Sequence, residues 1–493
     1  MSPELSVMKK MNRREFFGAS ALTLSSLLVS SPFVLAEPPK DKLRIALVGC
    51  GGRGSFLTTF FPNIPNAELV ALCDADSARL AETCKKVPDA KNAGSDMRAV
   101  FDDPDVDAVM IATCNHWHVL AAIWAMQAGK NVYLEKPVCL NFCEGEQLVA
   151  AAKKYGKLIQ IGTQMRSDPV HHPEAKRFLH EEKALGKIKS VRVSRFFARN
   201  AIGKRATPLV PPETVDFNMW LGPAPETPIY RNSLHYDWHW DWRTGNGETG
   251  NWGAHLLDDC RNDVFFDQIG APKRVMSVGA RIGYDDAGDS PNEFAIFFDT
   301  GVIPVVFCIS NLPDKANPKT AGACAGPTSG YTVFCEGGRY EKHWGGAVAF
   351  DENGEQIREF TATAEHIGPG PHIQNFVDCV LQNAPEKLTA PLKVGIDTAT
   401  WYNGANTSFR LGEPYSKKDA LDLVDDEETF ATALDDIEKH LDAQGLKMNA
   451  DTFRASRFLE YDGTAGIKGE YADAAKKLLT IDYREPFVVP SFN

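Results

Sequence analysis

A glycine-rich turn directly after an apolar, β-branched run is the feature that most restricts the fold of this 493-residue chain. Residues 43–48 read Leu-Arg-Ile-Ala-Leu-Val, which is typical of a buried parallel strand. The turn has the spacing G-x-G-x-x-G and comprises Gly49, Gly51, Gly52, Arg53 and Gly54. Glycines at this spacing let a chain turn tightly, approach a pyrophosphate closely and pack a helix against a strand. The turn therefore predicts a dinucleotide-binding site.

Asp74 supports this interpretation and indicates which dinucleotide is bound. It ends the second predicted strand, 20 residues after Gly54, where a carboxylate can bind ribose hydroxyls. A carboxylate repels a 2′-phosphate, so Asp74 favours NAD over NADP. Arg79 is the one nearby residue that argues for NADP, although it also fits a simple helix cation.

Strand and helix patterns then alternate through the first third of the chain. Further apolar runs cover residues 67–72, 107–112, 131–134 and 158–161, with helical patterns such as 119–128 and 144–154 between them. This alternation predicts an α/β fold with a doubly wound parallel sheet. We expect this Rossmann domain to cover residues 42–165.

The pattern changes after about residue 165. The strand-like segments are 188–197, 273–283, 292–299, 302–310 and 331–336. They predict an α+β domain built on a large, mainly antiparallel open sheet over residues 166–412, which we take as the substrate domain. Helices over 372–384 and 393–411 are expected to pack back on the first domain. Residues 413–493 are interpreted as a helical extension and tail, with an acidic, solvated helix within 416–444.

The first 36 residues resemble an export signal. Lys9, Lys10, Arg13 and Arg14 precede an apolar stretch, and Val34-Leu-Ala36 offers a cleavage site. Arg13-Arg14 followed by Glu-Phe-Phe favours a twin-arginine signal, and a general secretory signal is the alternative. We therefore expect a periplasmic protein with no stable membrane span in its mature form.

Composition excludes two classes of partner. The net charge is −12, and no basic block is long enough to bind nucleic acid. The eleven cysteines form no C-x-x-C pair, and no Cys/His spacing fits a zinc site, so we predict no metal and assign no disulfide.

Two later segments carry polar side chains suited to a reaction site. Lys136 follows the strand at 131–134 and precedes Pro137, which places it at the crevice of an open α/β sheet. There a lysine can donate to a carbinol oxygen; a surface lysine paired with Glu135 is the alternative. His255 follows Gly250-Asn-Trp-Gly-Ala and suits a general base, because an imidazole titrates near neutral pH. The alternative is a helix histidine paired with Asp258 or Asp259.

An aromatic segment lies just before His255. Trp238, Trp240 and Trp242 are spaced by two, so an extended chain would place their rings on one side. We expect the segment to form a wall for a sugar, with Arg243, Tyr236 or His235 binding hydroxyls. A core aromatic cluster is the alternative for at least one of the three rings.

Together these motifs resemble the glucose–fructose oxidoreductase / inositol dehydrogenase / rhizopine catabolism family. The similarity covers about residues 42–412. The matching segments are Gly49–Gly54, Asp74, Asn115-His116-Trp117-His118, Glu135-Lys136-Pro137, Gly162-Thr-Gln164 and Trp252-Gly-Ala-His255. The resemblance implies a catalytic role for Lys136, agrees with His255 as the base, and implies a homo-oligomer and hydride transfer between NAD(P) and a sugar-like alcohol.

The resemblance also implies cofactor contacts by Glu135 and Gln164 and by the turn that holds Asn115, His116 and His118. His116 and His118 are two residues apart and do not share a helix face, so they are not interpreted as a metal pair. Packing and capping are the alternative for this turn.

The sequence departs from the family at Asn251, where many members carry aspartate. Asparagine can bind substrate but cannot stabilise an imidazolium by charge, which makes Lys136 a candidate for more of the proton transfer. Three hypotheses follow. The first is an oxidoreductase for a sugar, polyol or glycoside hydroxyl; the second is a glycoside hydrolase or lyase that oxidises its substrate only transiently. The third, a dinucleotide-bound scaffold, has no chemical need for both Lys136 and His255.

Overall fold

The computed structural model describes residues 41–322, 326–361, 368–462 and 466–492. The predicted export signal over residues 1–36 lies outside these ranges.

The first sheet is parallel throughout and has the strand order β3-β2-β1-β4-β5-β6. This is the order of a Rossmann fold, as the sequence predicted. Its strands are β1 (Leu43–Val48), β2 (Ala67–Cys73), β3 (Lys91–Asn92), β4 (Ala108–Ile111), β5 (Asn131–Leu134) and β6 (Ile159–Ile161). The helices between them are α1 (Gly52–Leu57), α2 (Ser77–Cys84), α3 (Arg98–Phe101), α4 (His118–Gln127) and α5 (Phe142–Tyr155).

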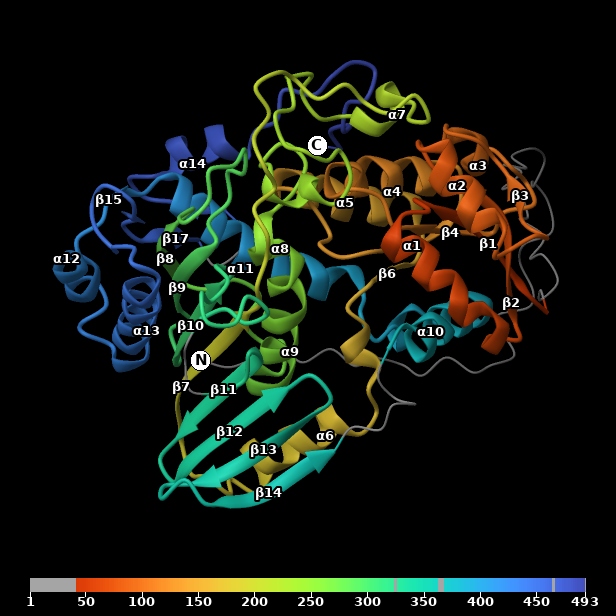
Figure 1. Ribbon diagram of the computed structural model, residues 1–493. Helices are drawn as coiled ribbons and strands as arrows, with labels where there is room; N and C mark the ends of the chain where they lie inside the picture. The colour runs from red at the N-terminus through yellow and green to blue at the C-terminus, as the bar shows by residue number, and fades with distance from the viewer. Residues whose placement is uncertain (1–40, 323–325, 362–367, 463–465, 493) are drawn as a thin grey trace, which may run out of the picture. The chain divides into compact units, whose positions relative to one another are not determined.

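Helices cover both faces of this sheet (Figure 1). Alternate residues of β1 face opposite sides, and both sets are apolar and buried, so each face needs a helical layer. Ala46 and Val48 pack in one apolar cluster with α4 and α5, whereas Ile45 and Leu47 pack with α10 (Pro369–Gln382). Each fully buried Val, Ile or Leu side chain contributes about 1.5–3 kcal/mol. The prediction that a helix near residues 372–384 returns to the first domain is therefore correct.

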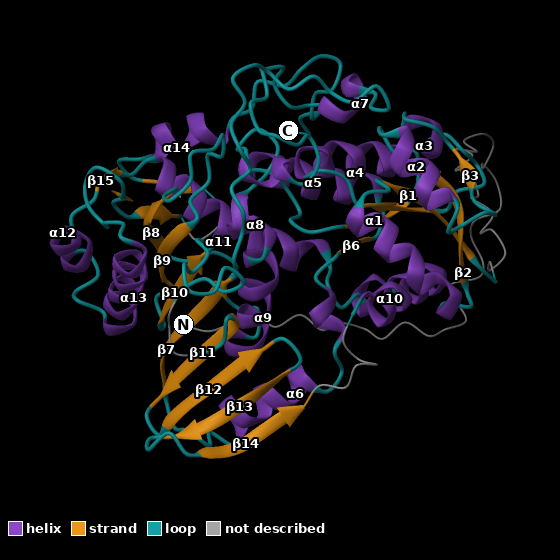
Figure 2. Cartoon of the chain, in the orientation of Figure 1, coloured by secondary structure: helices purple, strands orange, loops and turns teal. Residues whose placement is uncertain are grey.

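The second sheet is mixed but mostly antiparallel, as predicted, and β7–β10 is its parallel pair among the described strands. Its order is β14-β13-β12-β11-β7-β10-β9-β8-β16-β15 (Figure 2). The long strands are β7 (Ile188–Phe196), β8 (Arg274–Ala280), β9 (Glu293–Asp299), β10 (Pro304–Ser310), β11 (Ser329–Cys335), β12 (Gly338–His343), β13 (Gly346–Asp351) and β14 (Gln356–Thr361).

Helices pack on both sides of the second sheet. α9 (Gly253–Phe265) contacts β7 and β11 on the side that faces the reaction site, and α11 (Leu392–Arg410) packs between α9 and β8. α13 (Glu428–Gln444) lies over β9 and β10 on the other side and buries Phe430 and Leu434 there. The acidic helix expected to be solvated thus has one apolar face that closes part of the sheet.

The C-terminal extension contains strands as well as helices. Its helices are α12 (Lys417–Asp422), α13 and α14 (Ala472–Leu479). Its short strands are β15 (Glu413–Pro414), β16 (Arg454–Ala455), β17 (Leu459–Tyr461) and β18 (Ile467–Lys468), and β16 and β17 pair with the edge of β8. Strands of two or three residues leave no readable alternation, so composition alone indicated only helix. Along the described ranges, no helix is both long and apolar enough to cross a membrane.

Candidate active site

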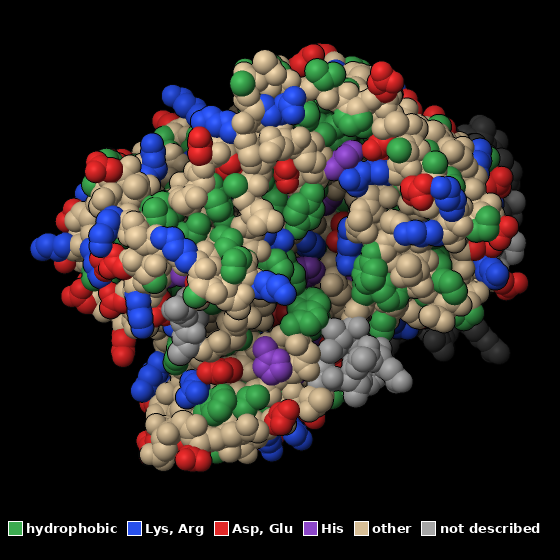
Figure 3. Space-filling model, viewed as in Figure 1, with side chains coloured by type: hydrophobic (Ala, Val, Ile, Leu, Met, Phe, Trp, Pro, Cys, Tyr) green, Lys and Arg blue, Asp and Glu red, His purple; other side chains and the backbone are tan. Residues whose placement is uncertain are grey.

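A cavity of about 800 Å³ lies at the carboxyl ends of the parallel strands. The loops after β1, β2, β4, β5 and β6 supply one wall, and residues 219–255 with Trp344 supply the other. Figure 3 shows the surface hollowed near the centre of this face, with histidine and basic side chains visible inside. Ligands bind in this crevice in open α/β sheets, so the fold itself indicates the site.

The glycine turn after β1 has the shape that a dinucleotide requires. Gly49 has φ +94°, and a Cβ there would meet the carbonyl oxygen of Ala112 at 2.5 Å. A Cβ on Gly54 would overlap the carbonyl oxygen of Gly49, so Gly54 allows α1 to pack on β1 and does not itself line the cavity. Gly49, Gly51, Gly52 and Arg53 do line it. With the backbone N–H groups that open α1, this cradle fits a pyrophosphate.

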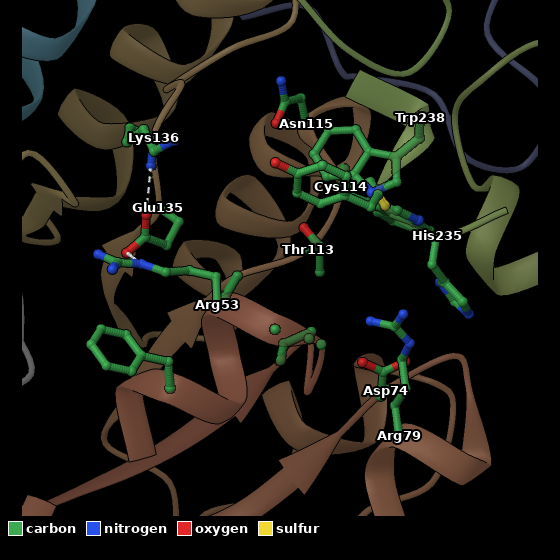
Figure 4. A pocket seen from close by; sticks show the side chains of 18 of the residues that line it. Arg53, Asp74, Arg79, Thr113, Cys114, Asn115, Glu135, Lys136, His235 and Trp238 are labelled. Carbon is green, nitrogen blue, oxygen red and sulfur yellow. Dashed lines mark hydrogen bonds and ion pairs between the residues drawn. The ribbon is translucent and has the colours of Figure 1, made fainter. Parts of the chain in front are cut away.

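Asp74 lies beside this turn, as predicted. Its Oδ2 accepts from the backbone N–H of Cys50 at 2.5 Å and its Oδ1 from that of Asp76 at 2.7 Å. These bonds fix the carboxylate at the cavity wall, where Arg79 lies next to it (Figure 4). Burial raises the pKa of Asp74, and the charge of Arg79 opposes that rise.

Arg53, Glu135 and Gln164 form one chain of polar contacts across the cavity. Arg53 Nε lies 2.8 Å from Glu135 Oε1, and Arg53 Nη2 donates to Gln164 Oε1 at 3.2 Å. All three residues line the cavity (Figure 4 shows the Arg53–Glu135 pair). Glu135 thus pairs with Arg53 and accepts from Lys136 only through the backbone N–H, at 3.3 Å, so its ion pair is with Arg53 and not with the Lys136 ammonium group.

The turn after β4 places one of its three predicted cofactor residues in the cavity lining. Asn115 lines the cavity and donates to Asn246 Oδ1 at 2.9 Å. His116 and His118 are buried outside the lining: His116 Nε2 lies 3.0 Å from the Trp220 carbonyl oxygen, and His118 Nδ1 lies 2.6 Å from that of Pro137. The 3₁₀ turn η2 (Asn115–Trp117) and the first residue of α4 direct both rings toward backbone carbonyl groups, so these rings hold neighbouring loops.

Lys136 reaches from the end of β5 to the end of α8 (Gly247–Asn251). Its Nζ donates to the carbonyl oxygen of Asn251 at 2.7 Å and to Asn251 Oδ1 at 3.2 Å. Burial lowers the pKa of Lys136 to about 8. The lysine is thus held by two uncharged acceptors and titrates close to the physiological range.

Asn251 is in turn oriented by a buried carboxylate that the sequence analysis missed. Its Nδ2 donates to Glu248 Oε2 at 3.2 Å, which leaves Oδ1 to accept from Lys136. Glu248 is 1% exposed and pairs with Arg195 and Arg199 at 2.9 Å each. Although desolvation opposes it, the two guanidinium groups keep the pKa of Glu248 below its usual value.

His255 lines the same cavity from the first turn of α9. It is 6% exposed, and its Nδ1 has no hydrogen-bond partner among the described residues. Burial first, and then the charge of Lys136, lower its pKa well below 6.5, so the ring is neutral and able to accept a proton. Asp258 instead pairs with Arg166 at 2.5 Å, and Asp259 lies 4.0 Å from His172, so the alternative of a histidine paired with its helix neighbours is wrong.

The aromatic segment is helical, not extended, which corrects the predicted wall. Trp238 and Trp240 belong to the 3₁₀ helix η5 (Asp237–Trp240); Trp238 lines the cavity, whereas Trp240 is buried behind it. Trp242 and Arg243 lie outside the lining, and Arg243 Nη2 pairs with Asp241 at 2.6 Å. Tyr236 and His235 do line the cavity, as the sequence suggested.

Two lining residues gave no usable signal in the sequence. His239 lies within η5, and Trp344 lies in the turn between β12 and β13. The Trp344 ring centroid is 5.5 Å from that of Trp252 and 6.4 Å from that of His255. Only the pairing of β12 with β13 brings this turn back over the cavity, and no local pattern encodes that approach.

Two family models match successive parts of the chain. The first, an oxidoreductase family with an NAD-binding Rossmann fold, matches residues 43–163. The second, the C-terminal alpha/beta domain of the same oxidoreductase family, matches residues 194–301.

Curated relatives align over part of their length. A levoglucosan dehydrogenase of Pseudarthrobacter phenanthrenivorans is 32% identical over 162 residues, which are 31% of this chain and 40% of the relative. A glycosyl hydrolase family 109 protein of Shewanella pealeana is 29% identical over 174 residues, 30% of this chain and 38% of the relative. The chain thus spans less than half the length of these relatives.

A solved structure agrees over a longer stretch. The WlbA dehydrogenase of Bordetella pertussis, determined with NADH and UDP-GlcNAcA, superposes with a TM-score of 0.54 at 18% identity. The match covers 75% of this chain and 96% of that one and shows a shared fold. The glycine turn with Asp74, the strand order and both family models lead to one conclusion: residues 43–163 and 194–301 are the NAD-binding Rossmann domain and the C-terminal α/β domain of a Gfo/Idh/MocA-type oxidoreductase.

Proposed function

We propose that this protein is an NAD-dependent oxidoreductase that transfers hydride between the nicotinamide and a hydroxyl-bearing carbon of a sugar, polyol or glycoside. The observation that carries the proposal is that Lys136 and His255 line the same cavity as the glycine turn and Asp74. A cavity of about 800 Å³ has room for both a dinucleotide and a small substrate.

The residues divide the chemistry between them. When bound, the nicotinamide ring supplies the hydride acceptor. Lys136 donates a hydrogen bond to the substrate oxygen and polarises it, while neutral His255 accepts the hydroxyl proton. Gly49, Gly51 and the start of α1 hold the pyrophosphate, Asp74 binds the ribose hydroxyls, and Arg53 with Glu135 and Gln164 fixes the wall between them.

A redox-neutral cleavage of glycosides is the second candidate function. Asn251 stands where many family members carry a carboxylate, and the chain is similar to a glycosyl hydrolase family 109 protein. In that reaction Lys136 and His255 would assist a transient oxidation of a ring carbon by bound NAD, and a bond next to the new carbonyl would break before the hydride returns.

One experiment separates the two functions. Purified protein loaded with NAD is mixed with sugars, polyols and aryl glycosides, and reduced nicotinamide and released aglycone are both followed. Net reduction of the cofactor supports the oxidoreductase, and aglycone release without net reduction supports the cleavage. If NAD is bound but neither net reduction nor aglycone release is seen, both functions are contradicted.

We also propose that the protein is exported through a twin-arginine signal and works in the periplasm as a homo-oligomer. Arg13-Arg14 before Glu-Phe-Phe supports the export route, which carries proteins already folded with their cofactor. Replacing both arginines by lysine should retain the protein in the cytoplasm, as cell fractionation would show. Light scattering of the mature protein tests the oligomer, and a monomer mass would contradict it.

A further inference from the structure

His239 lines the reaction cavity with one ring nitrogen unused. Its Nδ1 lies 2.5 Å from the carbonyl oxygen of Tyr236. A carbonyl can only accept, so Nδ1 carries the ring proton and Nε2 carries a lone pair. Within the described ranges no group hydrogen-bonds to Nε2. Burial lowers the pKa of His239 to about 3, which keeps the ring neutral and Nε2 an acceptor.

Its surroundings hold the His239 ring rigidly. The ring stacks on Trp238 with centroids 3.6 Å apart and an interplanar angle of 18°. Tyr236 adopts φ +64°, an unfavourable conformation for a non-glycine residue, and its carbonyl accepts from both Nδ1 and the backbone N–H of His239. Gly245 packs so closely that a Cβ there would lie 2.6 Å from the His239 Cα. Such an acceptor is pre-organised for a ligand donor.

At the reacting end of the cavity, no described cationic side chain remains available to pair with an acidic substrate. Among the described residues, the cationic side chains that line the cavity are Arg53, Arg79 and Lys136. Arg53 pairs with Glu135, Arg79 lies at the Asp74 end, and Lys136 is the group that meets the reacting oxygen (Figure 4). Behind the wall, Arg195 and Arg199 are both occupied by Glu248. The site therefore suits an uncharged substrate.

Trp344 adds an apolar face to this end. Its side chain is 45% exposed although it lies against Trp252 and His255. A large aromatic ring left open beside polar groups is the arrangement that binds the apolar face of a sugar ring.

We propose that the cavity selects a neutral polyhydroxylated ring, that His239 Nε2 accepts a hydrogen bond from a second hydroxyl of that ring, and that Trp344 stacks on its face. This inference rests on the proposed function and names the substrate class of the same site.

The test is equilibrium binding, which needs no turnover. NADH-loaded protein is titrated, with tryptophan fluorescence as the readout, against D-glucose, D-galactose, myo-inositol and their methyl ethers or glycosides, and against D-glucuronate and D-galacturonate. At least one neutral ligand should bind about tenfold or more tightly than the matching uronate. Equal or tighter binding of uronates, or no binding of any neutral ligand, overturns the proposal.

A cycle of variants and deoxy sugars then tests His239. For the tightest ligand, removing one hydroxyl other than the reacting one should weaken binding roughly five- to tenfold. His239→Leu should weaken binding of the full sugar by the same factor, and its affinity for the deoxy sugar should fall no further. His239→Gln keeps an acceptor near the Nε2 position and should still bind the full sugar more tightly than the deoxy sugar. If the affinity losses from His239→Leu and from the missing hydroxyl multiply, the two groups act independently, and the role of His239 is overturned.

Trp344→Ala serves as a second variant that is expected to fold, because the side chain is largely exposed. It should weaken binding of every neutral ligand about tenfold and leave NADH retention unchanged; unchanged sugar binding overturns the role of Trp344. Failure of the proposed function has a different signature: the sugar binds and its hydroxyl depends on His239, but no hydride is transferred. Hydride transfer without any dependence of that hydroxyl on His239 overturns only the present inference.

Discussion

The ammonium nitrogen of Lys136 lies 2.7 Å from the carbonyl oxygen of Asn251, a residue 115 positions later in the chain. This contact joins the end of β5 in the Rossmann sheet to the end of α8 beside the second sheet. The acceptors of its ammonium group are uncharged, and Glu248 reaches Lys136 only through the Asn251 amide. Lys136 is therefore fixed in place without being locked in its charged state.

Lys136→Met should lower kcat about 10²- to 10⁴-fold, because the variant loses the group that polarises the substrate oxygen. The dissociation constant for NAD should change little, since Lys136 makes no contact with the glycine turn. Steady-state kinetics and calorimetry measure the two quantities. Lys153→Met, at an exposed position on α5, is the matched control and should behave as wild type. A Lys136→Met enzyme with near-normal kcat would contradict the assignment.

The rate of alcohol oxidation should fall as the pH rises through about 8. Lys136 must donate to the reacting oxygen as an ammonium, and its pKa is lowered by burial to about 8, so the competent form is lost above that pH. The fall should approach about tenfold per pH unit. His255 is neutral well below pH 6.5, so no second fall from its protonation is expected near neutral pH. In Lys136→Arg, any remaining activity should lack the fall near pH 8; its persistence would assign the titration to another group.

Glu248→Gln should destabilise the protein strongly. The substitution leaves Arg195 and Arg199 without their shared carboxylate in a buried site, and breaking such a pair costs about 3–5 kcal/mol. Thermal or urea unfolding of the two proteins measures the loss. Lys204→Ala breaks the exposed pair with Asp285 and should change stability by less than about 1 kcal/mol. Equal effects of the two substitutions would show that Glu248 is not the structural centre of this wall.

Asp74→Asn should weaken NAD binding roughly tenfold and narrow the preference for NAD over NADP. The amide retains acceptors for the backbone N–H groups of Cys50 and Asp76, but it no longer repels a 2′-phosphate. Adding Arg79→Ala to this variant should then weaken the binding of NADP and leave the binding of NAD unchanged, because Arg79 is the cation at this end of the cavity. Calorimetric titration with both dinucleotides measures each step. If the ratio of the NAD and NADP dissociation constants is unchanged in Asp74→Asn, then Asp74 does not select the cofactor.

The parts of the site that were predictable are those whose geometry is local. The glycine turn and Asp74 follow from strand–turn–helix spacing, since each functional group lies within a few residues of the strand that positions it. Lys136 follows from the same logic at β5. Its meeting with His255 depends on how α9 packs under the second sheet, and the family resemblance rather than spacing indicated it.

The errors arise where side-chain direction depends on an irregular turn. His116 and His118 were expected to line the cavity, but the 3₁₀ turn η2 and the start of α4 direct their rings to carbonyl groups. A spacing of two suggested an extended strand for Trp238 and Trp240, whereas η5 is a 3₁₀ helix that buries one ring and exposes the other to the cavity. Trp344 reaches the site only through the pairing of β12 with β13, a non-local contact.

Transfer of deuterium from substrate to cofactor tests the central claim most directly. A sugar or polyol that binds is deuterated at its carbinol carbon and incubated with the NAD-loaded protein, and the bound dinucleotide is then analysed by mass spectrometry. We predict deuterium on the nicotinamide ring in the wild-type protein and a large loss of label in both Lys136→Met and His255→Leu. A dinucleotide that stays bound but unlabelled, while the sugar is bound or cleaved, would contradict hydride transfer at this site.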